Sequence, residues 1–241
     1  MCALSDADLL SLWEDGCGLH PLDRGVRAVC ALLTETSAEN VEDWTLGRRN
    51  QALAQLHSDC FGPELQGWTE CAQCGEKLEF WVDCRSLMEK QREGTDEPIV
   101  LHGRRFRVPT SRDLARVAGE SDPERATMKL LEVCRVETDD LHEQAEPLPE
   151  WSGGDLERLG EQMIAADPLA EIVLSFECPV CRSVREQALD LVEFVWAELE
   201  AAAKRILGEV HALASAYGWS EREILALSES RRAMYLAMVQ G

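Results

Sequence analysis

The chain has 241 residues, of which 45% are hydrophobic and 29% are charged, as in ordinary globular proteins. Its 45 acidic and 24 basic residues give a formal net charge of −21, which disfavours non-specific binding to nucleic acid or anionic membrane. No secretory leader and no apolar run of about 18 residues is present, so we expect a cytoplasmic protein without a membrane span. Because cytosolic thiols stay reduced, the ten cysteines favour a metal site over disulfides.

Residues 1–65 have the pattern of a helical region. Apolar residues recur every three or four positions in three stretches, which predicts helices over 5–16, 21–34 and 45–61. Serine is a favoured N-cap residue, and Ser5 stands where it can cap the first of these helices. The first quarter of the chain is therefore expected to be helical.

A different pattern begins at residue 66, where Cys71-x-x-Cys74 and a glycine precede alternating apolar residues. This order predicts a metal knuckle followed by a strand, over residues 66–87. Within residues 88–169, the pattern first predicts a hairpin with His102-Gly103 at its turn, and then a helix capped by Thr110 or Ser111. A helix after Pro123, a loop over 137–154 and a helix over 155–166 are predicted to follow.

The knuckle pattern returns over residues 170–190, where strand-like residues flank Cys178-x-x-Cys181. Within 191–241, a continuous apolar stripe then predicts a helix of about 27 residues, roughly 40 Å long. Signals for helix ends and starts follow it: Gly218 as the helix end, Ser220 with Glu223 as a capping box, and Ser228 as a last cap. This stretch is expected to be a C-terminal helical module.

The two Cys-x-x-Cys pairs are the main chemical signal. Together they can supply the four thiolates of a tetrahedral structural Zn²⁺ site, with the ligands Cys71, Cys74, Cys178 and Cys181. A zinc ribbon usually separates its knuckles by about 15–20 residues, whereas 103 residues (75–177) intervene here. We therefore predict an α+β, mostly helical fold in which a split zinc ribbon holds 88–169 as an insertion.

The alternative for these pairs is redox chemistry, but a thioredoxin-like motif precedes a helix, whereas strands are predicted after both pairs. Among the other cysteines, Cys84 could substitute as a ligand, and Cys30, Cys60 and Cys134 are predicted to be buried small hydrophobic residues. Four thiolates leave no coordination position for water, and the sequence has no phosphate loop, zinc-protease or nucleotide-binding motif. We therefore expect no enzymatic activity.

The C-terminal sequence carries the most specific resemblance. Its features are His211, Leu213-Ala214, Tyr217 to Ser220, Glu223 to Leu225, Leu227, Arg231-Arg232 and Tyr235-Leu236. This pattern resembles a family encoded with contractile phage tails and extracellular contractile injection systems, described as baseplate proteins similar to the T-even phage baseplate hub assembly protein. The order of knuckles, hairpin, Pro109 to Leu114 and long helix also matches. The resemblance implies a baseplate component or a hub-assembly chaperone, located in the cytoplasm or in an assembled particle, with baseplate or hub proteins as partners.

Aromatic, methionine and arginine side chains near the C-terminus are the candidate partner contacts, namely Trp219, Arg231, Arg232, Tyr235 and Met238. In the alternative interpretation, Tyr217 and Trp219 pack against the long helix, and the arginines pair with Glu221, Glu223 or Glu229. The competing function is a zinc-ribbon regulator that binds nucleic acid or transcription machinery. It needs a basic surface, which the charge of −21 disfavours.

Overall fold

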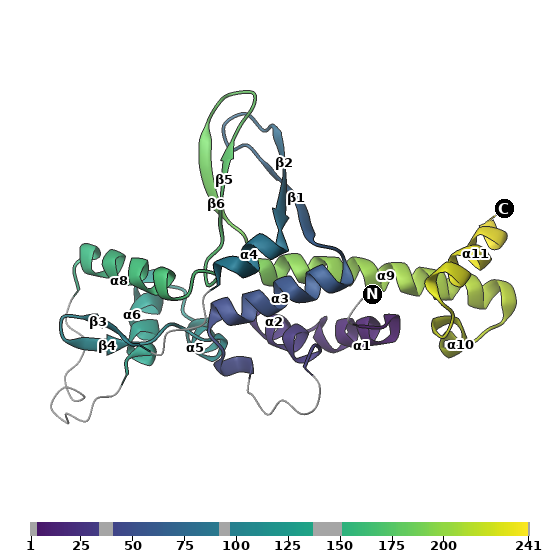
Figure 1. Ribbon diagram of the computed structural model, residues 1–241, viewed down its shortest axis with the longest axis horizontal. Helices are drawn as coiled ribbons and strands as arrows, with labels where there is room; N and C mark the ends of the chain where they lie inside the picture. Colours follow the sequence, from purple (N-terminus) through teal and green to yellow (C-terminus); the bar gives the residue numbers. More distant parts are fainter. Residues whose placement is uncertain (1–3, 34–40, 92–96, 137–150, 241) are drawn as a thin grey trace.

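The computed structural model describes residues 4–33, 41–91, 97–136 and 151–240 (Figure 1). The helices are α1 (Asp6–Gly16), α2 (Pro21–Cys30), the 3-10 helix η1 (Val41–Asp43), α3 (Leu46–Cys60), α4 (Cys84–Lys90), α5 (Ser111–Val117), α6 (Pro123–Cys134), α8 (Gly153–Ala166), α9 (Leu191–Tyr217), α10 (Glu221–Leu225) and α11 (Glu229–Gln240). The strands are β1 (Glu64–Glu70), β2 (Lys77–Asp83), β3 (Ile99–Leu101), β4 (Arg104–Phe106), β5 (Val173–Glu177) and β6 (Val184–Ala188).

The fold is α+β and mostly helical, as the sequence predicts. The described strands form three separate antiparallel hairpins, β1–β2, β3–β4 and β5–β6. None of the helices in the described ranges combines the length and the hydrophobicity that crossing a membrane requires. One boundary prediction is wrong, because β1 already begins at Glu64, inside the region expected to be helical.

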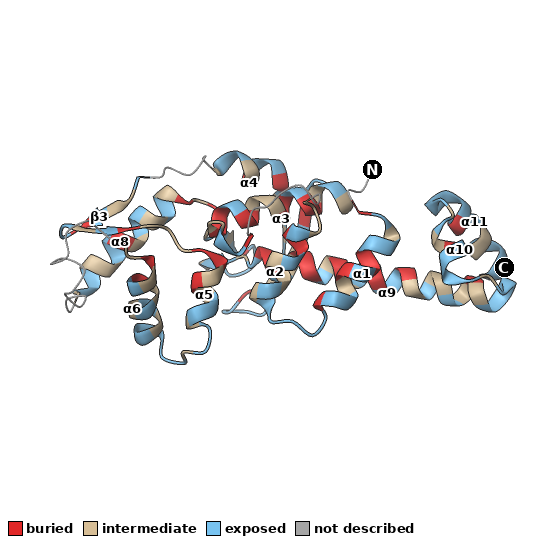
Figure 2. Cartoon of the chain, turned by 90° about the horizontal axis from the view of Figure 1, so that it is seen from below, coloured by how far each residue is buried: buried red, intermediate tan, exposed pale blue. Residues whose placement is uncertain are grey.

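The central helix α9 organises the main core. Helices α1, α2 and α3 pack against it, and buried residues of all four helices belong to one apolar cluster. Figure 2 marks the buried residues of these helices in red. Leu199 and Ile206 of α9 are fully buried there, as is Leu53 of α3. The predicted apolar stripe of α9 is therefore the face on which the N-terminal helices assemble.

A second, smaller core lies within the inserted segment. Phe106 of the β3–β4 hairpin is buried beside Leu131 of α6 and Leu159 of α8. Trp151 packs edge-on against Phe106, with ring centroids 5.5 Å apart. The hairpin turn falls where the sequence predicts it, since both His102 (φ 49°) and Gly103 (φ 77°) adopt positive φ.

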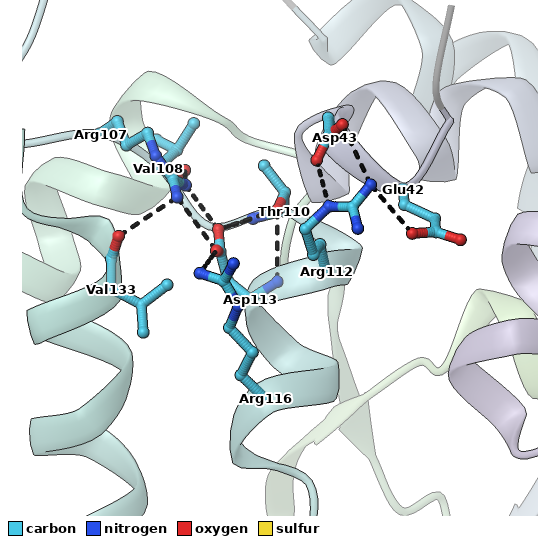
Figure 3. Close-up of polar contacts among 9 residues, drawn as sticks. All are labelled: Glu42, Asp43, Arg107, Val108, Thr110, Arg112, Asp113, Arg116 and Val133. Atoms are coloured by element: carbon cyan, nitrogen blue, oxygen red, sulfur yellow. Dashed lines mark hydrogen bonds and ion pairs between the residues drawn. The ribbon is translucent and has the colours of Figure 1, made fainter.

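A polar network connects the insertion to the N-terminal helices (Figure 3). Asp113 closes a capping box with Thr110 at the start of α5 and accepts hydrogen bonds from the Arg107 guanidinium. On the same helix, Arg112 donates to Asp43 of η1 and forms an ion pair with Glu42. The N-terminal cap thus positions α5 against two neighbouring parts of the chain.

Asp167 forms a second connection between distant segments. Its buried carboxylate accepts hydrogen bonds from the Gly47 N–H (2.7 Å), from Thr45 Oγ1 (3.2 Å) and from Gln91 Nε2 (2.7 Å). A carboxylate at this place satisfies free N–H groups and interacts favourably with the dipole of α3. The end of the insertion is therefore fastened to the start of α3.

Two helices, α8 and α2, differ in their bounds from the sequence predictions. Helix α8 begins at Gly153, two residues before the predicted start, because Ser152 and Asp155 form a capping box. Residues 137–150 of the predicted loop lie outside the described residues. Helix α2 ends at Cys30 and is followed by a turn, so it is shorter than predicted.

Candidate metal centre

Two hairpins rise side by side from the helical body (Figure 1). We call residues 64–83 and 173–188 the arm; they comprise β1–β2, β5–β6 and the turns that connect them. Glu70 pairs with Lys77 in the first hairpin, and Glu177 pairs with Val184 in the second. Each Cys-x-x-Cys pair therefore lies in the turn at the tip of its hairpin.

The first knuckle is a tight turn held by backbone hydrogen bonds. The Gly75 N–H donates to the Cys71 carbonyl, and the Cys71 N–H donates to the Glu76 carbonyl, both at 2.8 Å. Gly75 has φ 73°, in the left-handed region that favours glycine. This turn brings the sulfurs of Cys71 and Cys74 to the same side.

The second knuckle repeats this geometry. The Arg182 N–H donates to the Cys178 carbonyl, and the Cys178 N–H donates to the Ser183 carbonyl, both at 2.9 Å. Arg182 occupies the position of Gly75 and has φ 60°, an uncommon value for a residue with a Cβ. The two knuckles are therefore structurally equivalent although their sequences differ.

The four sulfurs converge at the tip of the arm. Cys71 Sγ lies 3.6 Å from Cys181 Sγ, and Cys74 Sγ lies 3.6 Å from Cys178 Sγ. All four sulfurs lie within 4.8 Å of one another. A tetrahedron with Zn–S bonds of about 2.3 Å has S···S edges of about 3.8 Å, so the donor set fits zinc in both size and chemistry.

Ser183 is not one of the four cysteines, but its hydroxyl lies within hydrogen-bonding distance of two of their sulfurs. Its hydroxyl oxygen lies 3.3 Å from Cys71 Sγ and 3.2 Å from Cys181 Sγ. Hydrogen bonding with Ser183 lowers the pKa of Cys71 to about 6 and is also the main cause of the lowered pKa of Cys181. A hydrogen bond from the Glu76 backbone lowers the pKa of Cys74, but desolvation and the adjacent thiols outweigh it and raise this pKa to about 12. Four close thiols cannot all ionise without a cation, so metal binding there releases protons.

The inner side of the arm has a small apolar core. Phe80 of β2 and Phe176 of β5 meet edge-to-face, with ring centroids 5.6 Å apart, and thereby join the two hairpins. Gly67 lies opposite Phe80 in the register, and a Cβ at this position would come within 2.5 Å of the Phe80 ring. Nearer the tip, Leu78 packs with the buried Cys71 and Cys178. A glycine on β1 thus makes room for the ring that spans the hairpins.

Cys84 lies away from the four-cysteine group. It is buried at the start of α4, with its Sγ 3.7 Å from His57 Nδ1, and burial raises its pKa to about 11. It is therefore not a substitute ligand in this arrangement. Within the described residues, the four predicted cysteines are the one group of His, Cys, Asp and Glu side chains with the geometry to hold a metal ion.

The predictions for the remaining cysteines have mixed outcomes. Cys134 is fully buried, as predicted. Cys30 is exposed, which corrects the prediction, because α2 buries the face that carries Ala28 and Val29. Cys60 is half-buried and disulfide-bonded, so the expectation of reduced thiols is wrong at this position.

The predicted partner residues lie in the connection between α9 and α10 and on α11, and they have different environments. Trp219 is half-buried, stacks on Tyr217 at a centroid distance of 4.7 Å and meets the edge of Tyr235 at 4.9 Å. Arg231 and Met238 are exposed, and the exposed fraction of Met238 is 66%. Packing therefore explains the aromatic cluster, whereas Met238 remains accessible.

Arg232 was predicted as a partner contact, but the structure buries it. Its side chain is only 2% exposed and forms ion pairs with Asp6 of α1 and with Glu209 of α9, where Nε donates to Oε2 at 2.7 Å. The acidic residues considered from the sequence, Glu221, Glu223 and Glu229, are not these partners. Arg232 thus holds the C-terminal module to the body rather than offering a surface contact.

Sequence reasoning identified the four cysteines but missed the residues that organise them. Ser183 stands two positions after Cys181, and this short spacing was the signal that its hydroxyl could contact the cysteine sulfurs. The Phe80–Phe176 contact joins residues almost 100 positions apart, and no local signal indicates it. Comparisons of the chain with protein-family models, with curated proteins and with solved structures gave no match.

Proposed function

We propose that this protein is a non-enzymatic, protein-binding scaffold in which a structural Zn²⁺ joins the two hairpins of the arm. The observation that carries this proposal is the convergence within 4.8 Å of four sulfurs from two knuckles far apart in the chain. Four thiolates complete a tetrahedral shell, so they suit a structural role better than a catalytic one, which needs an open position. The arm is then a split zinc ribbon.

Zinc would act here as a crosslink of the tertiary structure. The hairpins are otherwise joined by the Phe80–Phe176 contact and by polar contacts such as Thr69 Oγ1 to Gln187 Oε1 at 2.9 Å. Such a small core provides little stability of its own, and metal-binding free energy contributes directly to folding in small metal-stabilised units. The ion would therefore determine whether the arm keeps its shape.

For the biological setting, we propose a baseplate component or a hub-assembly chaperone of a contractile tail or injection system. This proposal rests on the sequence resemblance described above, which is concentrated in α9 to α11. It is supported by the exposed apolar side chains of α11, since Met234 is 62% and Met238 66% exposed. Flexible, exposed methionines are well suited to protein contacts. Baseplate or hub proteins would be the partners, in the cytoplasm or in the particle.

The metal is tested by elemental analysis of the purified full chain. We expect one zinc per chain, and loss of that zinc in Cys71→Ser and Cys178→Ser. Cys17→Ser is the matched control, because Cys17 is exposed and outside the four-cysteine group. Absence of metal from the parent chain, after purification without chelator and attempted zinc loading, would overturn the site.

The setting is tested by co-purification of the chain with baseplate and hub proteins of a contractile particle. Capture before assembly but absence from the finished particle would identify a chaperone, whereas presence in the particle would identify a component. A Met238→Ser variant asks whether α11 makes the contact, with the equally exposed Val184→Ser on the arm as control. Absence of interaction at every stage of assembly would refute the proposed setting.

A further inference from the structure

The outward face of the β1–β2 hairpin presents two exposed tryptophans. Trp68 is 58% exposed and Trp81 is 60% exposed. Side chains alternate along both strands, so the buried Leu65 and Leu78 lie on the opposite, inner face. We call this outer surface the Trp68–Trp81 face; its residues are Glu64, Gln66, Trp68, Glu70, Lys77, Glu79, Trp81 and Asp83.

The register makes the two indoles neighbours. Trp68 lies opposite Glu79, and Trp81 lies opposite Gln66, so the tryptophans occupy a diagonal position on one side of the sheet. The apolar contacts that hold the arm together are made on the other side, by Phe80 and Phe176. Two adjacent exposed indoles are unusual for a surface that only faces water, and tryptophan is enriched at the centres of protein interfaces.

The charge of this face limits what it can bind. Among the residues of this face, Glu64, Glu70, Glu79 and Asp83 carry carboxylates and Lys77 carries the one cation. The Asp83 carboxylate also caps α4. A phosphate backbone would be repelled by this surface, and so would another acidic surface. Aromatic faces attract cations, and the attraction is strongest for tryptophan. The face is therefore complementary to a positively charged segment.

The chain itself already contains one example of such binding. Lys77 Nζ lies 5.5 Å from the centroid of the Trp68 ring and 2.9 Å from Glu79 Oε1. One ammonium group is thus held by an indole and a carboxylate together. A side chain of the hairpin occupies the position that a lysine or arginine from outside could take.

We propose that the Trp68–Trp81 face binds a lysine- or arginine-bearing segment of a partner protein, with cationic groups over the indoles and the carboxylates of this face as counter-charges. Lys77 acts as an internal competitor that the incoming cation displaces from Trp68 and Glu79. This inference deepens the proposed function, on which it rests, by naming the class of partner that the arm accepts.

The test uses the zinc-loaded full chain and a fluorescein-labelled hexa-arginine peptide, with binding followed by anisotropy at several salt concentrations. Trp68→Thr and Trp81→Thr remove a ring, keep the net charge and retain a residue type that favours strands. We expect each to weaken binding about 3- to 10-fold, the range for loss of one partly desolvated cation–π contact. Val184→Thr, on the other hairpin of the arm, is the matched control and should leave binding unchanged.

The Lys77→Gln variant should change peptide affinity in the opposite direction from the tryptophan variants. Removal of the internal competitor should strengthen binding of the peptide at least 2-fold, whereas Lys204→Gln on α9 changes the net charge equally and should have little effect. Lys204 is a suitable control because it is exposed and paired with Glu200 of its own helix. Zinc content and thermal unfolding of every variant verify that the arm is intact.

Three outcomes would overturn the inference. The first is peptide binding that depends only on net charge, with the tryptophan variants equal to their parent. The second is Trp68-dependent binding of single-stranded DNA, and the third is Trp81-dependent dimerisation in sedimentation experiments. Each leaves the zinc analysis and baseplate co-purification unaffected, so failure of this inference is distinguishable from failure of the proposed function.

Discussion

At the scale of single residues, the two knuckles form the same turn from different amino acids. Position 75 is glycine and position 182 is arginine, yet both have φ near +60 to +75°. For a residue with a Cβ, the left-handed conformation costs about 1–2 kcal/mol. Arg182 therefore carries a backbone cost that Gly75 avoids.

This difference predicts opposite effects of exchange at the two positions. Gly75→Ala should destabilise the zinc-loaded chain by about 1 kcal/mol, whereas Arg182→Gly should have a neutral or stabilising effect. The free energy of unfolding in denaturant measures both. Arg182→Ala serves as the control, because it removes the exposed ion pair with Glu177 but keeps the Cβ. Equal losses in Arg182→Gly and Arg182→Ala would contradict the backbone explanation.

The ionisation of Asp113 should make the free energy of unfolding depend on pH. Burial raises the pKa of this carboxyl, but hydrogen bonds from Arg107 and Thr110 outweigh that cost, so its pKa is lowered in the folded chain. A lowered folded pKa means that the stability contributed by Asp113 is fully present above the unfolded value, near 3.9. That contribution is lost as the pH falls through the lower, folded value.

Asp113→Asn should therefore lower the free energy of unfolding by about 2 kcal/mol at pH 7, since it breaks a buried charge-assisted network. The difference from the parent chain should shrink between pH 5 and pH 2. Unfolding in urea at a series of pH values measures this difference. Asp43→Asn is the control, because its partner Arg112 is exposed and solvent screens the pair. A pH-independent difference would exclude this role for Asp113.

At the scale of elements, α11 is attached to the body through a buried charge. Arg232 connects three helices, because its guanidinium pairs with Asp6 of α1 and Glu209 of α9. Removing one partner of a buried ion pair usually destabilises a protein by about 3–5 kcal/mol. The two carboxylates here keep some contact with solvent, which moderates the cost.

Arg232→Met should lower stability by about 2 kcal/mol and make the C-terminal module more sensitive to proteolysis. The neighbouring Arg231→Met removes the same charge from an exposed position and should change stability little. Limited proteolysis with mass spectrometry reports where cleavage occurs. Similar cleavage patterns in the two variants would show that the ion pairs do not hold α11.

At the scale of the whole molecule, the tip of the arm has a small core of its own, whereas the base of the arm shares the main core through Leu65. The main cluster lies around α9, whereas the arm cluster contains Cys71, Leu78 and Cys178, with Phe176 packed against them. Because the apolar contacts of the body do not depend on the knuckles, removal of zinc should affect the two parts differently.

Chelation of zinc should therefore loosen the tip of the arm while the body stays folded. We expect far-ultraviolet circular dichroism to retain most of its helical signal and proteases to cut within 64–83 and 173–188. Readdition of zinc should restore protection. A cooperative loss of all helical signal on chelation would instead show that the body depends on the arm.

Local patterns predicted much of this arrangement. The stripe of α9 and the capping box of Ser220 and Glu223 both appear where expected, because helix periodicity and capping depend on neighbouring residues. The β3–β4 turn follows from its His102-Gly103 pair for the same reason. The exposure of Cys30 and the burial of Arg232 were not predicted, because each depends on where another helix packs.

The sequence by itself determined the donor set of the candidate metal centre, since the two Cys-x-x-Cys pairs indicate both the ligand type and the local geometry. Only the tertiary structure decided that these pairs meet, because their contact depends on how 103 intervening residues fold back. It also decided that Trp68 and Trp81 remain on the outer face, while Phe80 turns inward to Phe176. Local patterns specify turns and faces, whereas contacts between distant segments depend on long-range packing.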